Sequence, residues 1–300
     1  PCLTSIDTAE AVVNSLMSRY SEYNTELVDI NKLRTGKVRR EVVKMVGCGN
    51  DYIYFDCLGG NDLESPAGPA GRRSERHFGI GGDGVILICD SDKADAKMRM
   101  FNLDGSEGKM CGNGIRCVAK YLYDSHIVNK QEFTIETLSG IKNVKVITRS
   151  GEVIMVRVDM GKAELAPAAV PVKAKGESVV DREIEVGGKK YKVTCVSMGN
   201  PHCVVFTDNV DNLDIAKIGP AFEESELFPE GVNVEFVKAL DDHTLKMRVW
   251  ERGSGETYAC GTGACATAVA ACLNGLCKKG EDITVRLLGG DLTVNFTDDV

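Results

Sequence analysis

Short apolar runs, separated by Gly-rich or charged turns, follow one another along most of the chain, a pattern typical of β-strands. Two runs, at residues 183–186 and 191–196, flank Gly187-Gly188 and predict a hairpin with a tight turn. We expect the other clear strands at residues 52–55, 85–88, 133–136, 153–158 and 284–288.

The apolar spacing becomes helical after two Gly-x-Gly turns. Behind Gly112-Asn113-Gly114 the apolar residues are Ile115, Val118, Ala119 and Leu122, which predicts an amphipathic helix. Residues 264–276 are apolar on nearly every side, so this second helix should be buried all round. A third, docking helix is expected near residues 8–20, a loop at residues 61–76 and a connection at residues 162–171.

An internal repeat organises the chain. MCGNGIRC, which contains Cys111, matches ACGTGACA, which contains Cys260, and at nearly the same offset Gly49-Asn50 matches Gly199-Asn200. Matches in the same order at one spacing indicate two equivalent halves. We expect a helical extension at residues 1–40, one domain at 41–160 and another at 161–289, with the last strand, near 290–300, free to return to the first domain.

Composition narrows the class of protein. A net charge of −8 without a long basic run argues against nucleic acid, and no apolar stretch approaches the roughly 18 residues of a membrane span. The first thirty residues lack the layout of a secretory signal, so a cytoplasmic location is expected. In that reducing compartment most of the 12 cysteines should be small buried hydrophobes.

Cys111 and Cys260 each stand immediately before a Gly-x-Gly turn that opens a predicted helix. Unpaired N–H groups and the helix dipole favour a thiolate there, which predicts a thiol pKa lowered from about 8.5 to roughly 3.5–7.5. The same N–H groups form a carboxylate site, and Gly112 and Gly261 let a ligand approach the backbone. If the halves face each other across a pseudo-twofold axis, two thiols flank one bound carboxylate compound.

Such a site suits removal of the hydrogen next to a carboxylate and its return from the opposite face. Fixed N–H donors stabilise the charge that develops on the carboxylate, and one donor of this kind is worth about 100- to 1000-fold in rate. Because two adjacent thiolates repel, the resting pair should hold one thiolate and one thiol. These are the base and the acid that inversion of a stereocentre needs.

Other roles fit these motifs less well. A core cysteine is the ordinary role of any one Cys, but matched positions in a repeat favour chemistry. Zinc is disfavoured because the cysteines within each half are spaced too widely and the chain has 4 His. Two Gly-rich segments are similar to dinucleotide-binding motifs. Gly79–Gly84 precedes a predicted strand rather than the helix that such a motif opens. Gly261–Ala266 does open a helix, but its preceding Cys and its matching copy in the first half suit a carboxylate better than a pyrophosphate.

Six ordered motifs, over residues 44–300, resemble the diaminopimelate epimerase family. They are GNDYIYFD, RHFGIGGDG, FNLDGSEGKMCGNGIRC, MGNPHCVVF, GVNVEF and WERGSGETYACGTGACA. The resemblance implies an α/β (α+β) fold of two pseudo-symmetric domains. Each would be a barrel-like, mostly antiparallel sheet around a central helix, with the active site in the cleft between them. It also implies an isomerase that interconverts L,L- and meso-diaminopimelate, for lysine and peptidoglycan precursors, without cofactor or metal.

The resemblance also assigns site residues. Cys111 and Cys260 would be the acid–base pair, with His202 and Glu251 supporting thiol protonation. Arg252 would clamp the distal carboxylate, because its guanidinium binds carboxylates bidentately. The remaining substrate-binding positions would be Asn50, Asn102, Gly112, Asn113, Asn200, Asn233, Glu251, Gly261 and Thr262.

Alternatives remain open at the level of the sequence. A racemase of the same fold could act on histidine or proline, although proline-type relatives commonly have His after Cys-Gly where this chain has Asn113. The related isomerase branch lacks the cysteine pair. From another class, a redox-responsive amino-acid binding protein would use the facing cysteines as a disulfide switch. The expected partner is a small-molecule substrate, and homodimerisation is the base-rate expectation for a soluble enzyme.

Overall fold

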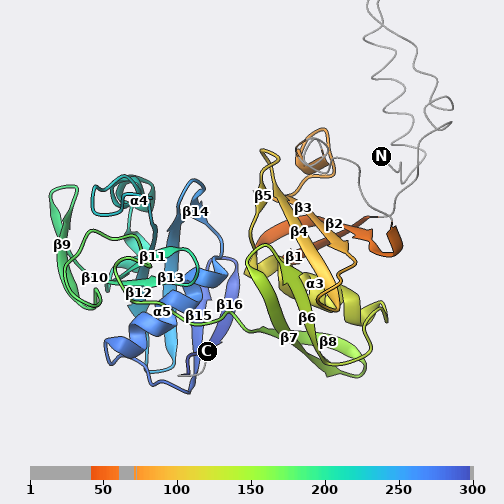
Figure 1. Cartoon of the computed structure of the whole chain (residues 1–300). Helices are drawn as coiled ribbons and strands as arrows, with labels where there is room; N and C mark the ends of the chain where they lie inside the picture. Colours follow the sequence, from red (N-terminus) through yellow and green to blue (C-terminus); the bar gives the residue numbers. More distant parts are fainter. Residues whose placement is uncertain (1–41, 61–70, 72, 298–300) are drawn as a thin grey trace, which may run out of the picture. The chain divides into compact units, whose positions relative to one another are not determined.

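The computed structural model describes residues 42–60, 71 and 73–297. The predicted docking helix and most of the predicted loop at 61–76 lie outside this part of the chain. Within it, two mixed sheets each pack around one long helix (Figure 1).

The first sheet has the strand order β1-β2-β3-β4-β6-β7-β8, and β5 pairs with β4. Neighbouring strands are antiparallel except in the parallel pairs β2–β3 and β4–β6. The elements of this half are β1 (Val42–Gly47), β2 (Asn50–Cys57), η1 (Leu58–Gly60), β3 (Gly84–Cys89), β4 (Ala96–Asn102), β5 (Glu107–Gly108), α3 (Gly112–Asp124), β6 (Glu132–Thr137), β7 (Gly140–Arg149) and β8 (Glu152–Val158).

The second sheet has the order β16-β15-β13-β12-β11-β10-β9, and β14 pairs with β13. Its parallel pairs are β11–β12 and β13–β15. The elements are β9 (Arg182–Val186), β10 (Lys189–Ser197), β11 (Pro201–Phe206), η2 (Val210–Asn212), α4 (Ile215–Glu223), β12 (Asn233–Ala239), β13 (Thr244–Glu251), β14 (Gly255–Thr257), α5 (Gly261–Leu273), β15 (Asp282–Leu287) and β16 (Gly290–Asn295).

The two sheets repeat one topology. Strands β1, β2, β3, β4, β6 and β7 correspond in order and pairing direction to β10, β11, β12, β13, β15 and β16. In both halves a short strand follows the fourth of these and leads into the long helix. The predicted fold of two similar α/β halves, with mostly antiparallel sheets around a central helix, is confirmed.

Each sheet curves around its helix because the apolar face of the helix needs burial. The four apolar residues predicted for α3 are all buried, in a core that includes residues of β2, β3 and β4. Helix α5 has eight buried residues and contacts β10, β11, β12, β13, β15 and β16, as expected from its apolar sequence. Burial of a large apolar side chain contributes about 1.5–3 kcal/mol, so Ile115 and Leu122 of α3 each stabilise the first core by about this amount.

The predicted strands and the hairpin around Gly187-Gly188 are present in the structure, as β2, β3, β6, β8, β15 and β9–β10. The suggestion that a strand near residues 290–300 returns to the first domain is wrong. That strand is β16, and it pairs with β15 in the second sheet. A short turn at Leu288-Gly289 joins the two strands, so the local antiparallel hairpin forms instead.

Candidate active site

Cys111 and Cys260 occupy equivalent places at the N-termini of α3 and α5. Each is the N-cap residue, with φ −130° and ψ 117° for Cys111 and φ −123° and ψ 114° for Cys260. Each sulfur accepts a 3.3 Å hydrogen bond from the backbone N–H three residues later, at Gly114 or Gly263. The repeat in the sequence therefore builds the same local geometry twice, with a thiol at a helix start.

The turns that follow the two cysteines touch each other. A Cβ built on Gly112 would lie 3.6 Å from the Cα of Gly261, and one built on Gly261 would lie 3.5 Å from the Cα of Gly112. The side-chain amide of Asn113 also donates to the carbonyl oxygen of Ala259, at an N···O distance of 3.5 Å. The two helix starts therefore meet.

Burial dominates the protonation of both thiols. It raises the pKa of Cys111, although the N–H groups of the helix start and the hydroxyl of Tyr52 act in the opposite direction. It raises the pKa of Cys260 further above the ordinary value, and the carboxylates of Glu251 and Glu235 add to that rise. The prediction of lowered thiol pKa values is wrong, because removal of the thiols from water outweighs the N–H donors.

Glu251 lies at the end of β13, beside Cys260. Its Oε1 accepts a 2.5 Å hydrogen bond from the hydroxyl of Thr257, and its carboxyl group also hydrogen-bonds with the Cys260 thiol. Burial raises the pKa of Glu251, while both of these hydrogen bonds lower it. A carboxyl group with a raised pKa next to a thiol is suited to hold or release a proton there.

In the first half, hydrogen bonds join the turn after Cys111 to a surface loop. Arg116 Nη2 donates to Asn113 Oδ1 at 2.7 Å, and Asn113 Nδ2 donates to Asn50 Oδ1 at 2.5 Å. Asn50 Nδ2 donates in turn to Asp83 Oδ2 at 3.3 Å, and Arg76 pairs with Asp83 Oδ1 at 2.9 Å. The amides of Asn50 and Asn113 are therefore held by each other, which fixes the start of α3.

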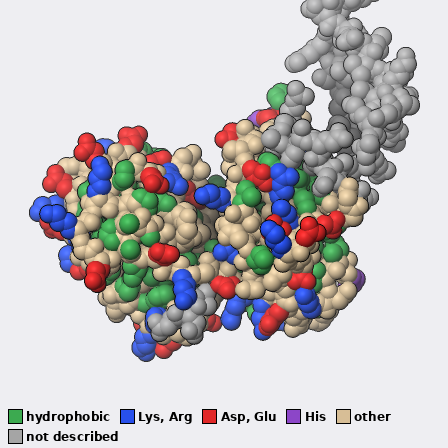
Figure 2. Space-filling model, viewed as in Figure 1, with side chains coloured by type: hydrophobic (Ala, Val, Ile, Leu, Met, Phe, Trp, Pro, Cys, Tyr) green, Lys and Arg blue, Asp and Glu red, His purple; other side chains and the backbone are tan. Residues whose placement is uncertain are grey.

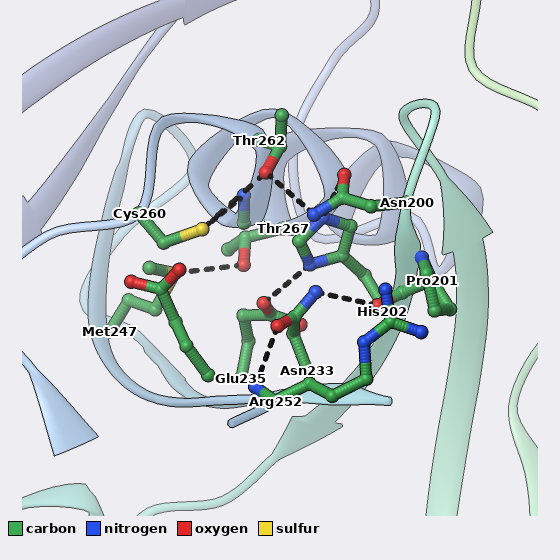
Figure 3. Close-up of polar contacts among 12 residues, drawn as sticks. Asn200, Pro201, His202, Asn233, Glu235, Met247, Arg252, Cys260, Thr262 and Thr267 are labelled. Carbon is green, nitrogen blue, oxygen red and sulfur yellow. Dashed lines mark hydrogen bonds and ion pairs between the residues drawn. The ribbon is translucent and has the colours of Figure 1, made fainter. Parts of the chain in front are cut away.

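In the second half, the hydrogen bonds lead to the sulfur (Figure 3). His202 Nδ1 is 2.7 Å from Glu235 Oε1, and its Nε2 is 3.0 Å from Asn200 Oδ1. Asn200 Nδ2 donates to the hydroxyl oxygen of Thr262 at 3.3 Å, and this oxygen is 3.4 Å from Cys260 Sγ. His202 thus reaches Cys260 through two intermediate side chains.

The residues assigned to the distal end of a substrate differ in their placement. Asn233 Oδ1 accepts from the backbone N–H of Arg252 at 2.9 Å, and its amide donates to the carbonyl of Pro201, also at 2.9 Å. The exposed guanidinium of Arg252 donates to the carbonyl of Glu230 at 2.6 Å. Asn102 is exposed at the end of β4, and its amide donates within its own turn at 3.0 Å.

Two neighbours of the cysteines were missed by the sequence reasoning. Glu235 is fully buried, and its position inside the apolar strand β12 was a readable signal, because isolated carboxylates are rare in such runs. Tyr52 is buried on β2 with its hydroxyl directed to Cys111. Nothing in its local sequence pattern distinguishes it from a core aromatic residue.

Two alternative sites can be compared with the structure. Gly84 begins strand β3, so the Gly-rich segment before it opens a strand rather than a helix, as expected. Among the described residues, no three or more His, Cys, Asp and Glu side chains are grouped as metal ligands would be. In the same part of the chain, no helix has the length and apolar character of a membrane span.

Comparison with known proteins decides the family. The family model described as Diaminopimelate epimerase matches residues 42–166 and 194–300. The chain belongs to the diaminopimelate epimerase family. It is 52% identical over 255 residues to the diaminopimelate epimerase of Acetivibrio thermocellus, covering 85% of this chain and 90% of that protein. Identity to the diaminopimelate epimerase of Methanococcus maripaludis is also 52% over 255 residues, covering 85% and 91%.

Two solved structures that resemble this member of the diaminopimelate epimerase family are distant from it in sequence. A probable proline racemase from Agrobacterium radiobacter has a TM-score of 0.62 at 17% identity, covering 86% of this chain and 85% of that one. A Bacillus anthracis phenazine biosynthesis protein of the PhzF family also has a TM-score of 0.62 at 17% identity, covering 87% and 90%. These similarities support the fold alone.

Proposed function

We propose that this protein epimerises diaminopimelate, interconverting the L,L and meso isomers, with Cys111 and Cys260 as the acid–base pair. The observation that carries the proposal is the contact between two helix starts that each have a cysteine as N-cap residue. It is supported by the family and by relatives of that name at about half identity. The product would enter lysine and peptidoglycan precursor synthesis.

In the proposed reaction the substrate carboxylate lies at the two helix starts, on backbone N–H groups of Gly112, Asn113, Gly261 and Thr262. One sulfur removes the α-hydrogen as a thiolate while the other, as a thiol, returns a proton to the opposite face. The N–H donors stabilise the charge that moves onto the carboxylate. The two thiols supply both acid and base, so no step calls for a cofactor.

The bound substrate would also lower the raised pKa values of the two thiols. Its α-ammonium group is a cation, and a cation near a buried thiol favours the thiolate. Glu251, beside Cys260, is suited to receive this ammonium group and to adjust the thiol. Arg252 would pair with the distal carboxylate, with Asn50, Asn102, Asn200 and Asn233 lining the rest of the site and His202 supporting Cys260.

We also propose a cytoplasmic location, because a pair of free thiols persists in a reducing compartment. The partner would be the small-molecule substrate. Homodimerisation and the domain boundaries near residues 40 and 160 stay predictions.

The test is an incubation of the reduced protein with L,L-diaminopimelate in heavy water, with hydrogen exchange and stereochemistry followed together. Separate acid and base groups predict deuterium in the meso product early, and little in recovered substrate. Exchange into substrate at the same rate as into product would refute two separate groups. Absence of exchange in folded, reduced protein would reject this substrate, and histidine and proline would then be tested.

A further inference from the structure

Glu235 is a fully buried acidic residue in the second half. Its side chain on β12 is fully buried, and Oε1 lies 2.7 Å from His202 Nδ1. Its other oxygen, Oε2, has no hydrogen-bond partner within the described part of the chain. A buried carboxylate destabilises the fold unless it is paired, so its position calls for a role beyond packing.

The surroundings of His202 define the direction of its hydrogen bonds. The ring is fully buried, with Nδ1 against the Glu235 carboxylate and Nε2 against the amide oxygen of Asn200, at 2.7 and 3.0 Å. Each ring nitrogen therefore faces an oxygen that can accept a hydrogen bond, and the contact with Glu235 fixes the orientation of the ring.

The donors continue in one direction to the sulfur. With its oxygen taken by His202, the Asn200 amide directs its N–H to the hydroxyl oxygen of Thr262. That oxygen then accepts from Asn200, and the Thr262 hydroxyl hydrogen is free to point at Cys260 Sγ, 3.4 Å away, the direction in which this contact lowers the pKa of the thiol. Hydrogen bonds that run in one direction polarise one another, and a donor at the sulfur favours the thiolate.

The glycine after Thr262 brings the carboxylate close to this turn. A Cβ on Gly263 would lie 2.7 Å from Glu235 Oε1 and 3.2 Å from Cys260 Sγ, too close for a larger residue without displacement. The same Gly263 donates its N–H to the sulfur. Glu235 therefore packs directly against the turn that holds Cys260.

In the first half, the hydrogen bonds at the equivalent positions run in the opposite direction. Asn50 and Asn113 correspond in the repeat to Asn200 and Thr262. Here Asn113 donates to Asn50, which donates to Asp83, so the hydrogen bonds run away from the cysteine of this half. The feature is thus specific to Cys260.

We propose that Glu235 is a positioning residue that, through His202 and Asn200, holds the Thr262 hydroxyl as a hydrogen-bond donor to Cys260 Sγ. The proposal rests on the proposed function in so far as Cys260 is an acid–base group. It adds that the two thiols are controlled by different residues, although the halves share one fold.

The test measures the reactivity of Cys260 directly, without substrate. The reduced protein is treated with iodoacetamide at pH 8, and alkylation of each cysteine is followed by peptide mass spectrometry. Because the thiolate is the reactive form, Thr262→Val should slow alkylation of Cys260 about tenfold, the worth of one hydrogen bond to a charged group. Thr262→Ser, which keeps the hydroxyl, should restore the rate.

Glu235→Gln separates the proposed role from a simple charge effect. In the proposal, loss of the carboxylate removes the acceptor that orients the His202 ring, the Asn200 amide turns over, and the Thr262 hydroxyl donates to Asn200 instead of Cys260. Alkylation of Cys260 should then slow as it does in the Thr262→Val variant. If Glu235 acted on the thiol by charge alone, its removal would accelerate alkylation, and that result would overturn the proposal.

Two controls make the result specific. Thr267→Val removes a buried hydroxyl from the same helix, where it donates to Met247 Sδ at 3.1 Å, and should leave Cys260 reactivity unchanged. Cys111, alkylated in the same samples, should also keep its rate. If Thr267→Val slowed alkylation of Cys260 as much as Thr262→Val does, the effect would come from a general disturbance of α5. That result would refute the proposed relay, the series of hydrogen bonds from Glu235 through His202, Asn200 and Thr262 to Cys260.

Failure of this proposal can be told apart from failure of the proposed function. If the Thr262→Val variant epimerises diaminopimelate normally and its Cys260 is alkylated at an unchanged rate, the relay is rejected and the proposed enzyme function stands. Slowed alkylation in a protein that does not act on diaminopimelate would retain the relay and reject the substrate. Thermal melting shows whether the Glu235→Gln variant folds. If it does not, the comparison of Thr262→Val with Thr262→Ser tests the relay.

Discussion

Asp51, on strand β2, forms ion pairs with Arg76 and Lys44 that contribute to the stability of the fold. Arg76 contacts both carboxylate oxygens of Asp51, at 3.0 and 2.6 Å, and Lys44 lies 2.9 Å from Oδ2. The hydrogen bonds from Arg76, with those from Lys44, hold the pKa of Asp51 at about 2 instead of 3.8, although burial opposes them. One pKa unit corresponds to about 1.4 kcal/mol, so the shift from 3.8 to about 2 is worth at most roughly 2.5 kcal/mol.

The effect in solution should be smaller than that limit. The side chain of Asp51 is 14% exposed but that of Arg76 is 53% exposed, so salt and water screen the pair. We expect Asp51→Asn to lower the free energy of unfolding at pH 7 by about 1–2 kcal/mol. Because the folded-state pKa is depressed, this contribution is complete above about pH 4 to 5 and is lost as the pH falls towards 2.

The assay is urea unfolding of the wild type and of Asp51→Asn at pH 7 and at pH 3. The stability difference should shrink by about half at pH 3. Asp56→Asn, on the same strand, is the control, since Asp56 accepts from the neutral donors Leu58 N–H and Tyr121 hydroxyl, both at 2.9 Å. An Asp51→Asn difference that is absent at pH 7, or independent of pH, would refute the electrostatic reasoning.

Three further predictions concern the site. Because Glu251 raises the pKa of Cys260, Glu251→Gln should make alkylation of Cys260 begin at lower pH, and an unchanged pH profile would exclude this influence. Gly263→Ala would place a methyl group 2.7 Å from Glu235 Oε1, so urea unfolding should show a loss of about 1–3 kcal/mol. Arg252→Ala should raise the KM for diaminopimelate at least tenfold with little change in melting temperature, and unchanged kinetics would move the distal clamp elsewhere.

Local patterns carried much of the fold. The short apolar runs that marked β2 and β3 and the helical spacing after Gly112 each reflect burial, which a sequence records directly. Helix α4 was not predicted: it contains Pro220, and its N-cap residue Asp214 makes no side-chain capping hydrogen bond. The helix is stabilised by packing of Ile215 and Phe222 against the second sheet, a contact between segments that are distant in the sequence.

The candidate site was predictable where the repeat marked it. Matched positions singled out Cys111 and Cys260 among 12 cysteines, and the structure places both at helix starts. Their pKa values were predicted in the wrong direction, because the helix start is visible in the sequence while the depth of burial is a property of the packed protein. Glu235 was missed although a lone carboxylate in an apolar strand is itself a signal.

Asymmetric neighbours of the two thiols have a kinetic consequence. Cys111 faces the hydroxyl of Tyr52, whereas Cys260 faces Glu251 and the hydroxyl of Thr262. An epimerase leaves the equilibrium ratio of its isomers untouched, so this difference acts on the barriers of the two proton transfers. Forward and reverse turnover should therefore show unequal primary isotope effects, a directional bias that two identical halves would not have.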